Sequence, residues 1–98
     1  MTTVGVAAAE ALTRSLAMEL APIRVNAIAP GWTDTPLVSN VLGANYDAVI
    51  RSVSEKIPVQ LIGQAAEVAE AVIMLMSNGF INGEVLHIDG GERYVSVA

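Results

Sequence analysis

Two short apolar segments, each ending at a glycine turn, constrain the fold of this chain more than any other feature. Ile23–Ala29 contains β-branched residues and stops at Pro30–Gly31, and Glu84–Ile88 stops at Asp89–Gly91. Segments of this kind predict strands followed by sharp turns. A long stretch with a helical pattern separates them, and strands joined by such a crossover pair in parallel with a right-handed connection.

The segment before the first strand has the pattern of a helix. Apolar residues recur at every fourth position over Ala7–Leu20, and Pro22 stops the pattern. The apolar stripe consists of Ala8, Leu12, Leu16 and Leu20. We therefore expect an amphipathic helix whose apolar stripe stays exposed in a chain of this size and offers a contact for another copy.

The crossover contains the clearest helical pattern. Over Ala65–Met76, apolar residues follow the i, i+3, i+4, i+7 spacing, and Gly79 supplies a helix stop. The stripe consists of Ala65, Val68, Ala69, Val72, Ile73 and Met76. Residues 37–56 contain Gly43 and Asn45, which predicts one or two short helices that form a flap. Residues 57–64 are expected to be a connection.

The composition indicates that these elements belong to a larger sheet. The chain has 98 residues, of which 53% are apolar and 15% charged. This balance suits the strands of a parallel sheet, which are covered on both faces. A chain of about 100 residues buries only about two thirds of its unfolded surface. We therefore expect the chain to be part of a larger α/β domain.

Charge and residue counts exclude several classes of function. Ten acidic residues against five basic ones argue against nucleic-acid binding, which needs clustered Lys and Arg. The absence of Cys excludes disulfides and thiolate chemistry, and the single histidine, His87, has no partners at metal-ligand spacing. No apolar run approaches the roughly 20 residues of a membrane span, and the N-terminus does not resemble a signal peptide. We expect no metal, no membrane association and a cytoplasmic location.

Three motifs in order resemble the C-terminal part of the short-chain dehydrogenase/reductase family. The first is Glu10–Trp32, which includes Ile-Arg-Val-Asn-Ala-Ile-Ala-Pro-Gly and is followed by Thr35 in the Pro-Gly-x-x-x-Thr pattern. The second is Glu67–Ala69 before an apolar helix, and the third is Gly83–Gly91. The resemblance covers nearly the whole chain from about Ala7.

The resemblance implies an α/β fold. The family has a Rossmann-type, three-layer fold with a seven-stranded parallel sheet and binds NAD or NADP. Residues 1–98 would then be the C-terminal segment of a single NAD(P)-binding domain, a partial fold with the last two parallel strands and their flanking helices. A different Rossmann-like enzyme, such as a methyltransferase, is disfavoured by the residues around Pro30–Gly31 and Asp89–Gly91.

The loop after the first strand carries the candidate cofactor-binding residues, Pro30, Gly31, Thr33 and Thr35. The resemblance implies that the Thr33 backbone meets the nicotinamide carboxamide and that the Thr35 hydroxyl meets the pyrophosphate. Ligands of open α/β sheets bind at this end of the strands. The alternative is a plain strand-to-helix turn in which Asp34 or Thr35 caps the next helix.

Other polar residues are interpreted structurally. Arg24 and Asn26 are expected to lie inside the first strand and to find hydrogen bonds near its edge. Asp89 and Gly90 are interpreted as parts of a strand-ending turn, and His87 as a structural residue or one at a subunit contact.

The resemblance leaves the chain without a catalytic residue. The family's phosphate loop and catalytic Ser lie upstream of any segment present, and its Tyr-x-x-x-Lys pair aligns with Thr2 and Val6. Neither side chain can donate a proton or lower a neighbouring pKa as that pair does. Two origins stay open. The chain begins at an internal or misassigned start, or it descends from a relative that had already lost the pair.

Two functions follow from the resemblance. The first is hydride transfer between a nicotinamide cofactor and an alcohol or carbonyl compound, with the chain inactive alone. The second is a non-catalytic interaction module that joins copies of itself or a full-length family member, through the helix over residues 7–20 and through the last strand with its neighbouring helix. The determinants of the substrate and of NAD against NADP lie outside the residues present.

Overall fold

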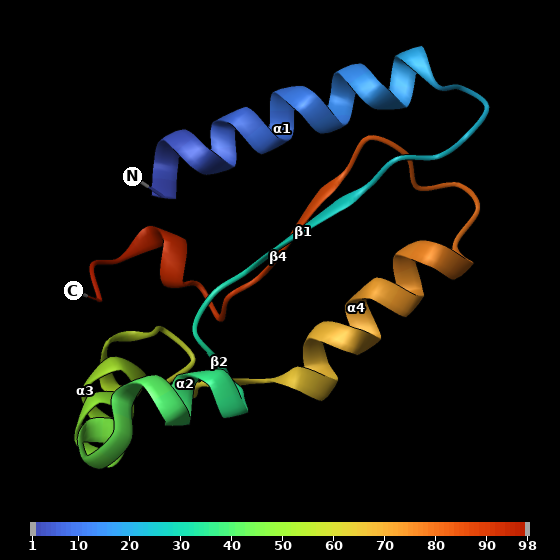
Figure 1. Cartoon of the computed structure of the whole chain (residues 1–98). Helices are drawn as coiled ribbons and strands as arrows, with labels where there is room; N and C mark the ends of the chain where they lie inside the picture. Colours follow the sequence, from blue (N-terminus) through green and yellow to red (C-terminus); the bar gives the residue numbers. More distant parts are fainter. Residues whose placement is uncertain (1, 98) are drawn as a thin grey trace. The chain divides into compact units, whose positions relative to one another are not determined.

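The computed structural model describes residues 2–97 (Figure 1), and these form the α/β chain that the sequence predicts. The helices are α1 (Thr2–Glu19), α2 (Pro36–Leu42), α3 (Tyr46–Lys56) and α4 (Ala65–Ser77). The strands are β1 (Ala27–Pro30), β2 (Thr33–Asp34), β3 (Gly63–Gln64) and β4 (Val85–Ile88), and single 3₁₀ turns are formed by η1 (Gly43–Asn45) and η2 (Glu92–Tyr94).

Strands β1 and β4 pair side by side in parallel (Figure 1). The N–H of Ala27 donates to the carbonyl of Glu84 (2.9 Å), and the N–H of Gly31 donates to that of Ile88 (3.0 Å). From the first of these bonds to the second, both the donor and the acceptor move four residues forward in the sequence, so the strands run in the same direction. The predicted pair of parallel strands is confirmed, although β1 begins at Ala27 instead of Ile23, and the handedness of the crossover stays a prediction.

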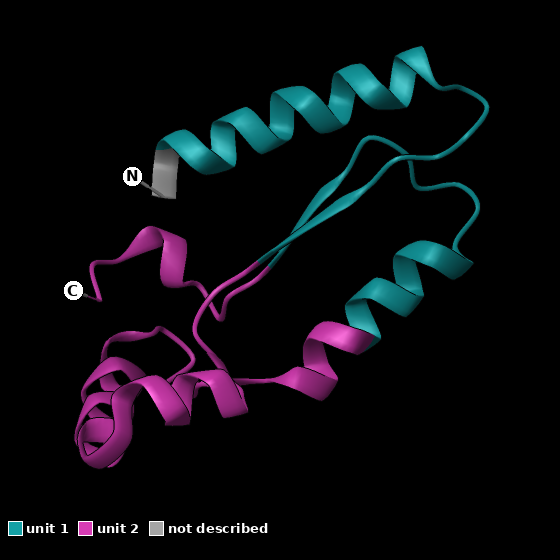
Figure 2. Ribbon diagram, viewed as in Figure 1, with its two compact units in different colours: residues 1–29, 70–87 teal, residues 30–69, 88–98 magenta. Residues whose placement is uncertain are grey.

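The chain divides into two compact units (Figure 2). The first contains residues 1–29 and 70–87, and the second contains residues 30–69 and 88–98. The expectation that residues 1–98 form one segment of a single domain stays a prediction.

In the first unit, α1 buries its small side chains and not its leucine stripe. Ala17 and Thr13 are buried, whereas Leu12 is 60% exposed and Met18 is 67% exposed. A Cβ added at Gly83 would lie 3.5 Å from that of Ala17, so the helix approaches the chain before β4 closely. Of the predicted apolar stripe, Ala8, Leu12 and Leu20 are exposed, as expected, and Leu16 is half-buried. Close approach selects small residues for the buried face.

The predicted helix over Ala65–Met76 is confirmed as α4, and its apolar stripe is only partly covered. Leu75 is buried, and Val68 and Val72 are half-buried, whereas Ile73 and Met76 are exposed. The helix is apolar on several faces, so periodicity alone does not identify the buried one.

Arg24 fastens the end of α4 to the chain before β1. Its guanidinium donates to the carbonyls of Leu75 (2.8 Å), Met76 (2.9 Å) and Ile81 (3.1 Å). The last carbonyls of a helix lack partners within the helix, and a cation there also interacts favourably with the helix dipole. Arg24 therefore lies before the strand, not inside it as predicted, but it has the hydrogen bonds expected of it.

Asn26, two residues after Arg24, also connects segments through its side chain. Its amide donates to the carbonyl of Ile81 (3.0 Å), and its side-chain oxygen accepts from the N–H of Glu84 (3.0 Å). Like Arg24 it precedes β1, and it connects the start of this strand to the start of β4.

In the second unit, the prediction of one or two short helices is confirmed, and they are α2 and α3. Val53 and Ile57 are buried and form its small core. The connection after α3 turns through Gln60, whose φ of 59° is in the left-handed region. This connection ends in β3, which pairs in parallel with β2, a pairing that no sequence pattern predicts.

We expect the Arg24→Met variant to lose about 2–3 kcal/mol of unfolding free energy, because three carbonyl oxygens lose a charged donor while the apolar stem is kept. Urea unfolding followed by circular dichroism at 222 nm measures this. Arg51→Met, at an exposed arginine on α3, is the matched control and should cost less than about 0.5 kcal/mol. Equal losses in the two variants would contradict the role given to Arg24.

Candidate functional site

The loop that follows β1 is held against the turn that follows β4. The N–H of Gly31 donates to the carbonyl of Ile88, and a Cβ at Gly31 would lie only 2.9 Å from the Cβ of Asp89. Contacts this short do not occur between real Cβ atoms, so the position requires glycine. Residues 30–35 therefore begin from a fixed point at the carboxyl end of the strand.

The pairing of β2 with β3 sets the direction of the loop backbone. Thr33 lies opposite Gly63, and the N–H of Gly63 donates to the carbonyl of Trp32 (3.0 Å). In a parallel ladder, a residue bonds to the two residues that flank its partner. The N–H and C=O of Thr33 are therefore directed to the opposite edge of β2. This backbone presents one donor and one acceptor side by side, the pattern that a carboxamide complements.

Thr35 caps helix α2. Its hydroxyl oxygen accepts from the N–H of Val38 (3.4 Å), and Pro36 occupies the first turn, so the capping alternative describes its contact. A threonine hydroxyl both accepts and donates, and capping uses only its acceptor. Its O–H can still donate to a phosphate oxygen, so the two interpretations of Thr35 are compatible.

The side chain of Thr33 turns back into the loop. Its hydroxyl donates to the carbonyl of Gly31 (3.0 Å). This bond stiffens the loop and keeps the Thr33 side chain away from the free edge of the backbone. Any ligand role of Thr33 therefore belongs to its main chain.

Asp34 joins the loop to the flap formed by α2 and α3. Its carboxylate accepts a hydrogen bond of 2.6 Å from the hydroxyl of Tyr46, the first residue of α3. The bond to Asp34, partial burial and the negative charges of Asp34 and Asp47 all raise the pKa of Tyr46. No sequence pattern predicts this contact, because the two residues belong to different predicted elements.

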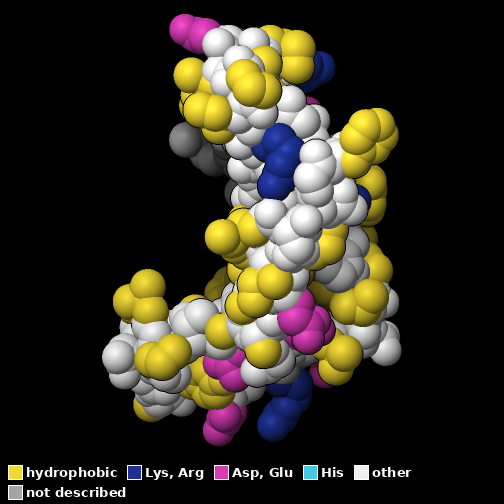
Figure 3. Space-filling model, turned by 90° about the vertical axis from the view of Figure 1, so that its right-hand side faces the viewer, with side chains coloured by type: hydrophobic (Ala, Val, Ile, Leu, Met, Phe, Trp, Pro, Cys, Tyr) yellow, Lys and Arg dark blue, Asp and Glu magenta, His cyan; other side chains and the backbone are white. Residues whose placement is uncertain are grey.

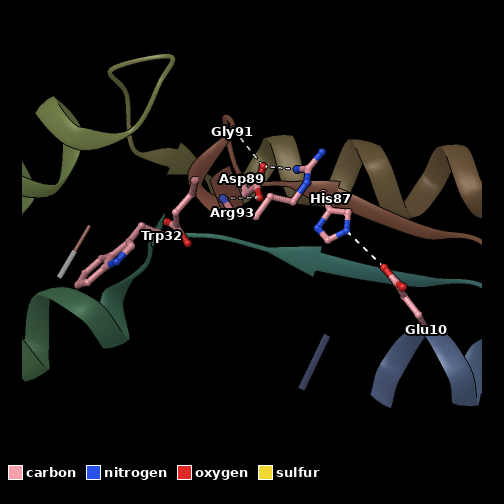
Figure 4. A network of polar contacts seen from close by, with 7 residues as sticks. Glu10, Trp32, His87, Asp89, Gly91 and Arg93 are labelled. Carbon is pink, nitrogen blue, oxygen red and sulfur yellow. Dashed lines mark hydrogen bonds and ion pairs between the residues drawn. The ribbon is translucent and has the colours of Figure 1, made fainter. Parts of the chain in front are cut away.

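Asp89 organises the turn after β4. One carboxylate oxygen accepts from the N–H of Gly91 (3.0 Å) and from the guanidinium of Arg93 (2.7 Å), and the other accepts from the N–H of Arg93 (3.2 Å). Burial alone would raise the pKa of Asp89, but the bonds from Gly91 and Arg93 outweigh it and hold the pKa below its usual value. Figure 4 shows this cluster beside Trp32, whose indole points away from it.

Gly90 is fixed by its surroundings. Its φ is 60°, and a Cβ there would lie 2.5 Å from a methyl carbon of Val59. The structural role expected of Asp89 and Gly90 agrees with these contacts.

Glu92 is a residue of the site that sequence reasoning missed. One of its carboxylate oxygens accepts from the N–H of Trp32 (3.0 Å), although the two residues lie far apart in the chain. A carboxylate soon after a Gly-Gly turn was the only available signal, and it does not identify the partner.

His87 belongs to the first unit. Its Nε2 is 4.0 Å from a carboxylate oxygen of Glu10 on α1, a contact that agrees with a structural role. Within residues 2–97, no group of three side chains could hold a metal ion, and no helix is long and apolar enough to cross a membrane. The alignment of Thr2 and Val6 with the catalytic pair stays an inference from resemblance.

A family model described as enoyl-(acyl carrier protein) reductase matches residues 2–92. The short-chain dehydrogenase/reductase ucsE of an Acremonium species is 38% identical over 85 residues, which are 87% of this chain and 32% of that protein. The short-chain reductase NovJ of Streptomyces niveus is 40% identical over 86 residues, which are 81% of this chain and 33% of that protein. The chain thus spans about a third of the length of these relatives.

Solved structures of dehydrogenases also match this chain. A small-chain dehydrogenase in complex with NADPH is 41% identical with a TM-score of 0.79, over 87% of this chain and 39% of that one. The ligand-free aldohexose dehydrogenase of Thermoplasma acidophilum is 36% identical with a TM-score of 0.80, over 91% of this chain and 39% of that one.

We expect the pKa of Tyr46 to lie above the value of about 10 that is usual for tyrosine, because its hydroxyl donates a hydrogen bond to the carboxylate of Asp34. Since the folded pKa is the higher one, the contact is intact below pH 10 and is lost as the pH rises through the folded pKa. Absorbance at 295 nm measures the titration in a Tyr94→Phe background, where Tyr46 is the only tyrosine.

The control is Asp34→Asn in the same background, which keeps an acceptor but removes the charge. Its Tyr46 pKa should fall toward the usual value. An unchanged pKa in this variant would contradict the assignment to Asp34.

Proposed function

Because the chain belongs to the short-chain dehydrogenase/reductase family, we propose that it forms the nicotinamide-facing, C-terminal part of an NAD- or NADP-dependent oxidoreductase domain. The reaction of the whole domain is hydride transfer between the cofactor and an alcohol or carbonyl compound. The cofactor supplies the hydride chemistry when bound, and the protein supplies orientation and a proton donor.

One observation carries this proposal, namely the free N–H and C=O of Thr33 on the open edge of β2. This pair would hold the carboxamide of the nicotinamide. The Thr35 hydroxyl would donate to the pyrophosphate, and Gly31 with Pro30 would fix where the loop begins. All four residues named from the sequence would thus act through one loop.

These 98 residues do not include the remaining parts of such a site. The residues aligned with the Tyr-x-x-x-Lys pair are Thr2 and Val6, and neither is an acid of suitable strength. The chain would therefore contribute cofactor contacts without catalysis and would be inactive alone. A cytoplasmic location stays a prediction.

We expect ¹⁵N-labelled chain to bind NADPH weakly and to shift the amide resonances of the loop, including those of Gly31 and Trp32. Thr33→Ser keeps both the N–H and the hydroxyl and should bind as the wild type does, whereas Thr33→Pro removes the N–H and should abolish the shifts at Gly31 and Trp32. Proline is tolerated at a strand edge whose N–H faces away from the ladder. Equal NADPH affinity in the two variants would overturn the role given to Thr33.

A second function is supported by the apolar surface of the first unit. Leu12 and Met18 on α1, Ile73 and Met76 on α4, and Phe80 are all exposed, Phe80 to 99%. Hydrophobic side chains are spread over the face shown in Figure 3. A monomer rarely exposes large contiguous apolar patches.

The outer edge of β1 adds to this surface. Beside it lies a groove of about 280 Å³ lined mainly by apolar atoms, including Ile28, Val72 and Leu75. Unpaired strand edges invite pairing with another chain. These features support a module that associates with itself or with a full-length relative.

We expect sedimentation at micromolar concentration to give a dimer or larger species. Leu12→Glu with Met18→Glu places two charges on the exposed face of α1 and should shift the chain to smaller species. Leu61→Glu, at an equally exposed residue (67%) outside the helices, is the matched control and should not. A wild-type chain that stays a compact monomer would contradict the association function.

A further inference from the structure

Two hydrogen bonds from different parts of the chain hold the backbone of Trp32. Its N–H donates to a carboxylate oxygen of Glu92, and its carbonyl accepts from the N–H of Gly63, each at 3.0 Å. The first bond belongs to the peptide plane between residues 31 and 32, and the second to the plane between residues 32 and 33. These planes share only the Cα of Trp32, so the two bonds together restrict its φ and ψ.

The second of these planes also carries the N–H of Thr33. In a trans peptide, the carbonyl and the N–H point in opposite directions. Fixing the carbonyl of Trp32 on Gly63 therefore directs the N–H of Thr33 to the open edge of β2. The orientation of this plane relative to the rest of the loop depends on the other bond, which Glu92 makes.

The surroundings of Glu92 keep its carboxylate in place. The turn that begins at Glu92 is braced by Asp89, which binds both the N–H and the guanidinium of Arg93 (Figure 4). A Cβ at Gly31 would lie 3.0 Å from the Glu92 carboxylate oxygen, so the glycine leaves room for it. A carboxylate that accepts from an N–H forms one of the stronger hydrogen bonds in proteins.

We propose that Glu92 is a positioning residue, which acts through Trp32 to aim the N–H of Thr33 at the carboxamide of a nicotinamide cofactor. The proposal rests on the cofactor role of the loop proposed above. Glu92 touches neither the cofactor nor the reacting atoms in this scheme. It fixes the direction of an N–H on the adjacent peptide plane.

The test begins without ligand. Deuterium exchange of the Trp32 amide, followed by NMR, measures how often its bond to Glu92 opens. Glu92→Ala should accelerate this exchange roughly 10-fold or more, as loss of a charge-assisted bond implies. Glu92→Gln keeps the reach and an acceptor and should stay near the wild type, whereas Glu92→Asp keeps the charge but is too short and should behave like Glu92→Ala.

Glu67→Ala is the matched control. Glu67 also accepts from a backbone N–H in the same unit, that of Gln64 at 2.9 Å. This variant should accelerate exchange at Gln64 and leave Trp32 unchanged. Far-UV circular dichroism verifies that each variant is folded. If Glu92→Ala does not fold, the comparison of Glu92→Gln with Glu92→Asp tests the proposal instead.

The second readout is the affinity for NADPH, taken from the shift of the Thr33 amide. Glu92→Ala and Glu92→Asp should weaken binding several-fold, and Glu92→Gln should restore it. Unchanged Trp32 exchange in Glu92→Ala would overturn the proposal, and so would faster exchange with unchanged NADPH affinity. Absence of NADPH binding in every protein, wild type included, would count against the cofactor role of the loop, while the exchange rates would still decide whether Glu92 holds Trp32.

Discussion

The parallel ladder between β1 and β4 is the constraint on which the candidate site depends. Because the strands run in the same direction, the loop after β1 and the turn after β4 begin at the same end of the sheet. The bond from Gly31 to the carbonyl of Ile88 is the last step of this ladder and the first contact of the site. An antiparallel pair would have sent the two segments to opposite ends.

Three carboxylates around the loop each accept hydrogen bonds from other groups of the chain. The carboxylates of Asp34, Asp89 and Glu92 accept from Tyr46, from Gly91 and Arg93, and from Trp32, respectively. Of the three, Asp89 is also paired with a cation, the guanidinium of Arg93, at 2.7 Å. The three acidic groups are thus bound to donors of the backbone, of Arg93 and of the flap, and these bonds order the loop.

The sequence predicts those parts of the structure that have a periodic or local signal. The parallel strands, α4 and the loop at Pro30–Thr35 follow from apolar segments, helical spacing and glycine turns. The buried face of α1 does not, since close approach at Gly83 selects Ala17 and Thr13 over the leucines. Likewise β3 is two residues long and Glu92 acts on a residue far away in the chain, so neither leaves a local pattern.

Pro30 has a consequence for any strand that pairs with the outer edge of β1. Along this segment, Val25, Ala27 and Gly31 bond to the β4 side, so Asn26, Ile28 and Pro30 face outward. Proline has no N–H to donate, so the last N–H on that side is that of Ile28, and at Pro30 only the carbonyl can bond. A neighbouring strand would therefore be held to β1 by one hydrogen bond fewer at the point where the loop begins.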